Sequence, residues 1–449
     1  MRVLTSTSAL ESSLQCFFIT VIFISLFPLK TQAAKVAPSW GLPPHQQTEG
    51  VFWRTHWYER ERTTPKIGYT RRARINAPEA VLDPRWGARK ETRENGLTLI
   101  QMEENLFQIR AAELYAELWG GHPGTANKRV TINGRTNYQL PRSGTEAAHC
   151  AFTYPIVPLA PTDIVNGFNA VQWNVDEGST FWGHALIDQA CIRVALTNSH
   201  PELVTKQLND LNLTVAARVT QQSETIRLSL SGTFPNPNPI SEVIYQAWYR
   251  GYDDDGDQNR EDWHGFTKDR QPVAFLGSSR NPPFRIKWDT SMIPAQKNVA
   301  VRAILSFKEI PDTVYLTRAT PGLTIRDRKN VSVHLYSPVD LPASFWSRAN
   351  QEKTCSFILD EAPASIERAE LYVKSWAGGP GEIDDYFTLN GVHFPIAEGQ
   401  GHAVQFSRLS VDPQILRQGR NTIRLLSDTE HHGIEIIYPG PALMVRSRF

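Results

Sequence analysis

Residues 112–119 read Ala-Glu-Leu-Tyr-Ala-Glu-Leu-Trp, and residues 369–376 read Ala-Glu-Leu-Tyr-Val-Lys-Ser-Trp. The similarity continues without a gap from residues 109–134 to residues 366–391, where twelve of 26 positions are identical. Both stretches end in an Asn-Gly pair. Self-similarity over this length indicates an internal duplication, so the chain contains two copies of one module of about 100 residues.

The repeated stretch alternates between two kinds of side chain, which is the pattern of a β-strand with one buried face. In the first copy the apolar face comprises Ala112, Leu114, Ala116 and Leu118, and the mixed face comprises Glu113, Tyr115, Glu117 and Trp119. Short segments of this kind, separated by Gly, Pro and Asn-Gly turns, fill residues 95–200 and 350–449. They predict two β-sandwich modules.

Length, charge and missing motifs limit the classes of function. With 449 residues the chain has room for about three domains. Its 47 basic and 46 acidic side chains are nearly balanced, which argues against a nucleic-acid partner. The sequence lacks the usual signatures of zinc proteases, esterases, nucleotide-binding proteins and nicotinamide enzymes.

The amino terminus has the features of a secretory signal peptide. An apolar run at residues 16–27 follows Arg2. Small residues come next, and cleavage is expected near Ala33 or Ala34, which would remove residues 1–34. The alternative is an uncleaved membrane anchor, but a run of about 12 residues is short for the roughly 20 that a spanning helix needs. We therefore expect a secreted or periplasmic protein with no stable membrane span after cleavage.

Residues 35–94 form a lead that is rich in Pro, Arg, Trp and Thr and has no sustained period. Because it offers no continuous apolar face, we expect an extended or partly disordered segment. Trp53, Trp57 and Tyr58 are candidates either for anchors that hold the lead against the body of the protein or for sugar-stacking residues.

Three cysteines remain after signal cleavage. Cys150 and Cys191 lie in the first copy, and the second copy has no cysteine at the matching positions. In an oxidising compartment we expect a disulfide between them, and closing about 40 residues would contribute roughly 3 to 4 kcal/mol. Cys355 is expected to be a small buried residue of a strand.

An Asn-Gly hairpin and a Gly-x-Asn segment occur once in each copy. The hairpins lie at residues 132–134 and 389–391, and the Gly-x-Asn segments begin at Gly167 and Gly419. In these motifs the copies resemble the galactose-binding-like jelly rolls appended to secreted carbohydrate-active proteins. The resemblance implies a jelly-roll fold and an association with carbohydrate.

Between the copies, residues 211–337 form a different module of alternating strands. A run at residues 281–290, Asn-Pro-Pro-Phe-Arg-Ile-Lys-Trp-Asp-Thr, is followed by a strand pattern at residues 299–305. This combination resembles the signature of bacterial Ig-like modules in secreted enzymes, which implies an Ig-like sandwich. The predicted fold class is therefore all-β, with three sandwich modules in the order jelly roll, Ig-like, jelly roll. Asn212 and Asn330 stand in sequons, which matter only if the source glycosylates.

An acidic insertion at residues 252–265 interrupts the central module and is a candidate calcium site. Four side chains with hard oxygens alternate in it: Asp253, Asp255, Asp257 and Asn259. They resemble the first four ligands of an EF-hand or dockerin-type loop. The pattern departs from that loop, because Gly256 comes early and His264 stands where the last Glu is expected. The alternatives are a solvated acidic hairpin tip and a catalytic acid cluster, although contiguous carboxylates do not favour catalysis.

Polar loops with aromatic side chains end each copy and are candidate ligand-binding sites. In the first copy they contain Trp119, Trp182 and His184, and in the second copy they contain Trp376, Asp428, Glu430, His431 and His432. Trp119 and Trp376 end equivalent strands, where an exposed indole could stack on a sugar ring and an enclosed one could pack in the core. The histidines could bind a ligand or act as general acids, or could be hydrogen-bonded loop residues.

Two hypotheses of function follow from these features. The first is a secreted multi-module protein that binds a glycan or glycoprotein ligand in polysaccharide or glycoprotein processing, with structural calcium as its expected cofactor. The second is a glycan-active hydrolase or lyase with carboxylate catalysis at a junction between the jelly rolls. Catalytic carboxylates on a β scaffold leave no motif in the sequence, so no catalytic residue is identified at this stage.

Overall fold

The computed structural model describes residues 48–58, 73–75, 96–120, 125–140, 151–175, 185–219, 224–233, 239–396, 403–430 and 432–449. These residues belong to a compact unit that spans Val36–Phe449. Strands dominate them, and their one α-helix, α1 (Pro201–Thr205), has five residues and is too short to cross a membrane. The prediction of an all-β protein built from stacked sheets is confirmed. The predicted signal peptide, Cys150, Trp182, His184 and His431 lie outside the described residues.

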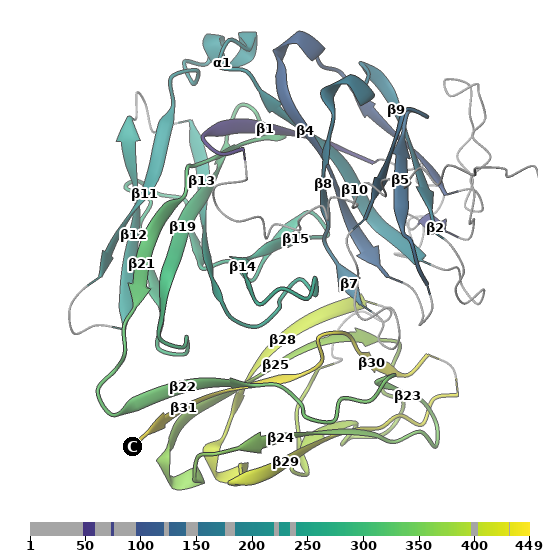
Figure 1. The fold of residues 1–449 in the computed structure, drawn as a ribbon, viewed down its shortest axis with the longest axis vertical. Helices are drawn as coiled ribbons and strands as arrows, with labels where there is room; N and C mark the ends of the chain where they lie inside the picture. The colour runs from purple at the N-terminus through teal and green to yellow at the C-terminus, as the bar shows by residue number, and fades with distance from the viewer. Residues whose placement is uncertain are drawn as a thin grey trace, which may run out of the picture. The chain divides into compact units, whose positions relative to one another are not determined.

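The first copy consists of two sheets (Figure 1), and apolar side chains of both belong to a buried core. Its strands are β3 (Leu97–Met102), β4 (Ile109–Trp119), β5 (Arg129–Ile132), β6 (Thr136–Gln139), β7 (Phe152–Thr153), β8 (Ile156–Leu159), β9 (Gly167–Asn174) and β10 (Ala185–Leu196). One sheet has the order β3-β9-β5-β6, and in the other β4 lies between β10 and the short strands β7 and β8. The predicted apolar face of β4 lies in the core, where Leu114 and Leu118 are buried.

The second copy repeats this arrangement. Its strands are β23 (Trp346–Ser347), β24 (Lys353–Leu359), β25 (Ile366–Ala377), β26 (Phe387–Leu389), β27 (Val392–His393), β28 (Ala403–Val411), β29 (Gly419–Leu425), β30 (Ile434–Ile436) and β31 (Ala442–Arg448). The order β24-β29-β26-β27 matches β3-β9-β5-β6 strand for strand, and β25 corresponds to β4. β22 (Val331–Tyr336), which the sequence placed in the central module, pairs with β31 and so joins the sheet of the second copy.

The Asn-Gly motif has the same structural role in both copies. Asn133 and Asn390 have positive φ angles of 50° and 52°, which asparagine tolerates better than most residues. Asn133 Nδ2 donates to Asn169 Oδ1 (2.9 Å), and Asn390 Nδ2 donates to Asn421 Oδ1 (2.7 Å). The side-chain oxygens of the two hairpin asparagines accept the next backbone N–H groups of β9 and β29, at 2.8 and 2.9 Å. The Gly-x-Asn segment recurs because its asparagine locks the hairpin turn to the neighbouring strand.

The central module shares a sheet with the first copy. Its strands are β11 (Asn212–Val219), β12 (Thr225–Thr233), β13 (Ile240–Arg250), β14 (Glu261–His264), β15 (Phe266–Lys268), β16 (Gln271–Val273), β17 (Gly277–Ser279), β18 (Ile286–Asp289), β19 (Gln296–Phe307), β20 (Thr313–Leu316) and β21 (Thr320–Ile325). Eight strands of one twelve-stranded sheet follow the order β14-β13-β19-β20-β1-β10-β4-β7, so β1 (Val51–Trp57) joins the two modules (Figure 1). β1 belongs to the predicted lead, and its residue Trp53 and the adjacent Tyr58 are buried as anchors. A further piece of the lead, β2 (Ala73–Ile75), pairs with β10.

The three modules meet in a shared aromatic cluster, which we call the junction core. It contains Tyr115, Phe152, Tyr154, Ile156 and Cys191 from the first copy, Trp248, Trp263, Phe266 and Ala300 from the central module, and Val404 and Ile437 from the second copy. Trp119 and Trp376 pack at its edge. The mixed faces of β4 and β25 therefore lie against other modules. Cys355 is fully buried, as expected, and the disulfide of Cys191 stays a prediction because its partner lies outside the described residues.

Candidate functional site

The duplicated strands bring two ionisable groups to the junction core from matching positions. Glu117 on β4 corresponds in the repeat to Lys374 on β25, and their exposed fractions are 1% and 0%. Burying an ionisable group is costly unless neighbouring groups compensate for the lost water. The neighbours of Glu117 and Lys374 provide this compensation, and they differ between the two copies.

Lys374 links all three modules. Its Nζ donates to the carbonyl oxygen of Phe152 on β7 (2.8 Å) and lies 5.2 Å from the ring centroid of Tyr154. The acidic insertion of the central module passes beside it, with Gly256 at a φ of 77°. A Cβ atom on Gly256 would lie 3.1 Å from Lys374 Nζ and 3.1 Å from the Phe152 oxygen. Gly256 comes early for a calcium loop, and because it has no side chain the insertion can approach the junction core closely.

Three carboxylates of the acidic insertion converge beside that lysine. One oxygen from each of Asp253, Asp255 and Asp257 lies within 4.8 Å of the others. Asp253 is also fixed by three backbone N–H groups of the loop, which it accepts at 2.6 to 3.1 Å. Asn259, the fourth predicted ligand, is not in this triad, and its side-chain oxygen accepts a backbone N–H two residues later at 3.2 Å. The structure thus brings together three of the four predicted ligands.

Burial and neighbouring carboxylates make Asp253 and Asp255 poor acids. Burial, together with the nearby Asp257, raises the pKa of Asp253 to about 7 in spite of Lys374. Burial and the neighbouring Asp253 raise the pKa of Asp255 to about 7 as well. Burial lowers the pKa of Lys374 to about 8, against the opposing effect of the carboxylates. The cluster therefore titrates near neutral pH, and a divalent cation would favour its ionised form.

The far end of the insertion has a structural role. His264 occupies the position where a calcium loop has its last Glu, and its Nδ1 lies 2.8 Å from Asp254 Oδ2. Its Nε2 lies 2.9 Å from the carbonyl oxygen of Tyr249, and the two rings stack with centroids 3.7 Å apart. Both ring nitrogens are engaged, so His264 ties the insertion to β13.

Glu117 is a buried acidic group that the sequence did not single out as a site. Its Oε1 accepts the backbone N–H of Asp269 in the β15–β16 turn (2.7 Å) and lies 3.2 Å from the Tyr115 hydroxyl. Burial, with the carboxylates of Asp269 and Asp188 nearby, raises the pKa of Glu117 to about 8. Glu117 is therefore largely protonated at neutral pH, and it links the first copy to the central module by hydrogen bonds.

A half-exposed row of residues crosses three neighbouring strands of the second copy. Trp346 on β23 lies opposite Glu435 on β30, and Glu435 lies opposite Trp376 on β25. Directly opposed residues of antiparallel strands point to the same face, so two half-buried indoles flank one half-buried carboxylate. The two tryptophan positions are two strand spacings apart, about 10 Å. We call these three residues the tryptophan row.

Neighbouring loops hold the tryptophan row in place. The Arg348 guanidinium lies 4.4 Å from the ring centroid of Trp346, and the Trp346 indole N–H donates to the carbonyl oxygen of His432. The exposed His432 ring lies 6.2 Å from the ring of Trp376. Gly433 has a φ of 71°, and a Cβ atom there would lie 2.0 Å from a backbone oxygen of β23. Only glycine lets this loop approach the row so closely.

The other predicted loop residues lie in different surroundings. Asp428 accepts the backbone N–H of Glu382 with both carboxylate oxygens, at 3.1 and 3.2 Å, and so stabilises a loop. Glu430 is exposed. Trp119, the counterpart of Trp376, lies opposite Phe152 at the edge of the junction core. Of the predicted binding residues that the structure describes, Trp376 and His432 are thus the two that it brings together.

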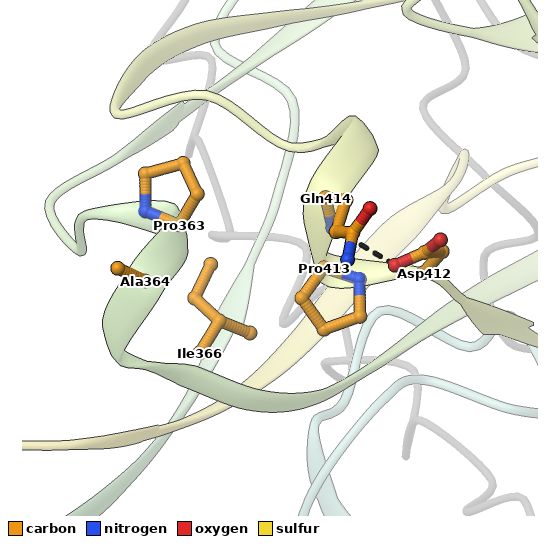
Figure 2. A pocket seen from close by; sticks show the side chains of 6 residues that line it. All are labelled: Pro363, Ala364, Ile366, Asp412, Pro413 and Gln414. Carbon is orange, nitrogen blue, oxygen red and sulfur yellow. Dashed lines mark hydrogen bonds between the residues drawn. The ribbon is translucent and has the colours of Figure 1, made fainter.

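Two hollows lie elsewhere on the described surface. One, of about 370 Å³, lies between the 3-10 turns Pro363–Ser365 and Pro413–Ile415 and is drawn in Figure 2. Its one lining carboxylate, Asp412, accepts the backbone N–H of Gln414 (3.0 Å) and so caps its own turn. The other hollow is a groove of about 550 Å³ between the central module and β22.

No family model and no curated protein matches the chain. Among solved structures it is similar to a beta-porphyranase of glycoside hydrolase family 86 from the human gut bacterium Bacteroides plebeius, with 13% identity, a TM-score of 0.24, and 65% of this chain and 43% of that chain covered. It is also similar to BuGH86 in complex with neoagarooctaose, with 11% identity, a TM-score of 0.23, and 52% and 33% covered. A third similarity is to a beta-glucuronidase of an uncultured Clostridium species, with 8% identity, a TM-score of 0.17, and 67% and 47% covered. The chain spans less than half the length of each of these three proteins.

Proposed function

We propose that this protein binds a glycan through the tryptophan row. The observation that carries the proposal is the pair of half-buried indoles, Trp346 and Trp376, with the Glu435 carboxylate between them. An indole face stacks on the apolar face of a sugar ring, and a carboxylate accepts hydrogen bonds from sugar hydroxyl groups. The backbone positions of the two tryptophans are about 10 Å apart, which exceeds one sugar ring, so an oligosaccharide segment is the ligand that fits the row.

Binding fits the accessible groups better than catalysis does. The carboxyl groups at the module junction, Glu117 and Asp253, are buried and hydrogen-bonded within the protein. A glycosidase needs two carboxyl groups that flank its substrate at about 5 to 10 Å. A hydrolase or lyase that uses the junction would therefore require the junction core to open, whereas each residue of the tryptophan row is partly exposed in the folded protein.

Removal of either indole is expected to weaken polysaccharide binding. The variants Trp346→Ala and Trp376→Ala should each lose about 2 kcal/mol of binding free energy, a factor of about 30 in Kd, because tryptophans typically carry this much of a binding surface. Calorimetric titration and affinity electrophoresis against a panel of polysaccharides measure the loss. Reducing-sugar release on the same panel tests the hydrolase alternative.

Phe168→Ala provides the matched control for these variants. Phe168 is an aromatic residue that is 59% exposed in the first copy, away from the tryptophan row, so its loss should leave binding unchanged. Trp119→Ala tests whether the duplicated position in the first copy also binds. A wild-type protein that binds nothing on the panel contradicts the proposal, and sugar release by the wild type would replace binding with catalysis.

We also propose that the acidic insertion holds a structural calcium ion. Asp253, Asp255 and Asp257 offer hard oxygens close enough together for one ion, which is the donor set that calcium prefers. The ion would neutralise the repulsion within the triad and stabilise the place where the three modules meet. Because the triad lies beside Lys374 and not among the residues of the tryptophan row, its loss should change stability and leave glycan binding intact.

A further inference from the structure

The groove of about 550 Å³ lies where the central module meets β22 of the second copy. Its polar lining consists of Arg250, Arg260, Gln296, His334, Tyr336 and Asp360. The volume falls within the usual range of ligand-binding clefts, about 300 to 1,000 Å³. The ligand that such a cleft can bind depends on which charged side chains of its walls have no ion-pair partner within the protein.

Two guanidinium groups lie on the wall formed by the central module. Arg250 ends β13, and Arg260 precedes β14, where its Nε donates to the backbone carbonyl of the residue after Arg250 (3.2 Å). Arg328 and Arg446, at the same boundary between modules, both pair with Glu224, at 2.8 and 2.6 Å. Within the described residues, neither guanidinium group of the groove has such an ion pair. The two therefore keep N–H donors available to a ligand.

The carboxylates at the opposite wall do not pair with these guanidinium groups. Glu361, beside the groove, has both carboxylate oxygens engaged, one with His334 Nδ1 (2.9 Å) and one with the Tyr336 hydroxyl (2.6 Å). Asp360 is the one carboxylate among the residues that line the groove. Asp360 and Glu361 balance the charge of the two arginines, but within the described residues neither forms an ion pair with Arg250 or Arg260, so the two guanidinium groups keep donors for a ligand.

Hydrogen bonds to Gln296 hold the backbone at Arg250 in place. Gln296 Oε1 accepts the backbone N–H of Arg250 (2.7 Å), and Gln296 Nε2 donates to the carbonyl oxygen of the same residue (3.1 Å). Burial and the like charge of Arg250 lower the pKa of Arg260, which nevertheless remains charged at physiological pH. The two arginines lie at the same end of the β13–β14 strand pair, and two neighbouring cations there favour an anion between them.

We propose that this groove binds the acidic group of a glycan chain, either a carboxylate or a sulfate ester. A planar guanidinium group presents paired N–H donors that match the oxygens of both anions. The inference rests on the proposed glycan binding and adds that the glycan carries negative charge.

The test compares the wild type with an Arg250→Gln/Arg260→Gln double variant. The probes are polygalacturonate for the carboxylate, dextran sulfate for the sulfate ester and dextran as a neutral chain, each measured by affinity electrophoresis at low and at physiological ionic strength. The wild type should bind at least one anionic probe more tightly than dextran. The double variant should bind that probe with a Kd about ten- to a hundredfold higher, because it lacks the hydrogen bonds from the two charged guanidinium groups. The anionic probe that is bound more tightly identifies the acidic group.

Arg227→Gln is the matched control, because it removes the same charge from an exposed position on β12. An equal loss in Arg227→Gln, or anionic probes that bind no better than dextran, overturns the inference. Trp346→Ala/Trp376→Ala distinguishes the two sites. If that variant loses binding to the polysaccharide panel while the wild type shows no anion preference, the result supports glycan binding by the tryptophan row and contradicts anion binding by the groove. If the wild type binds nothing on the panel and none of the three probes, both fail.

Discussion

Replacement of Lys374 by methionine is expected to lower the free energy of unfolding by about 3 to 5 kcal/mol at neutral pH. Methionine keeps the apolar body of the side chain and removes its ammonium group. Asp253 and Asp255 would then be buried without their neighbouring cation, and the hydrogen bond of 2.8 Å from Lys374 to Phe152 would be lost. The second copy would lose a polar link to both other modules, so the loss exceeds that of a surface charge.

The pH dependence of this variant provides its sharpest test. Because the pKa values of Asp253 and Asp255 are raised to about 7, both groups are protonated in mild acid, where Lys374 has little to compensate. The stability deficit of Lys374→Met should therefore grow as the pH rises from about 5 to about 7. Urea unfolding of the full chain, followed by tryptophan fluorescence, measures it.

Lys287→Met is the control for that experiment. Lys287 is exposed on β18, so the same substitution there should change the stability by no more than about 0.5 kcal/mol. Equal stability of Lys374→Met and the wild type at neutral pH would show that the lysine does not hold the modules together.

The features that the sequence predicted well are those fixed by neighbours along the chain. The alternation in residues 112–119 identified β4 and its apolar face, because side chains of a strand alternate between two sides. The Asn-Gly pairs identified both hairpin turns, since Asn133 and Asn390 adopt the positive φ that such turns require. Of the four alternating residues predicted as calcium ligands, local loop geometry brings Asp253, Asp255 and Asp257 together but not Asn259, and calcium binding there stays a prediction.

The features that the sequence did not reveal depend on distant pairing. The mixed face of β4 has the same pattern whether it meets water or another module, so Glu117 gave no sign that it is buried. The role of β1 depends on its pairing with β20 and β10, which no local signal encodes. The tryptophan row depends on the registers of β23 and β25 against β30, so Trp346 and Glu435 could not be grouped with Trp376 in advance.

Calcium is expected to raise the stability of the protein at about pH 8 and to have little effect at about pH 5.5. In the ion-free protein, Asp253 and Asp255 have raised pKa values, so the stability that their protons contribute is present below their ordinary pKa near 4. That stability is lost as the pH rises through about 7. Calcium binds the ionised carboxylates, so it restores stability in the pH range where the protons have left. With a Kd of about 0.1 to 1 mM and about 10 mM calcium, mass action gives about 1.4 to 2.7 kcal/mol.

Melting curves of the full chain with calcium, magnesium or a chelator test this expectation. Asp255→Asn/Asp257→Asn should abolish the response to calcium, whereas Asp412→Asn, which removes a carboxylate from an exposed turn outside the triad, should retain it. Lys374→Met should respond to calcium more strongly than the wild type, because the buried ammonium no longer repels the ion while the triad keeps its negative charge. A melting temperature at pH 8 that neither calcium nor chelator changes would refute the site. An ion bound between three ionised carboxylates of the folded protein must raise its stability.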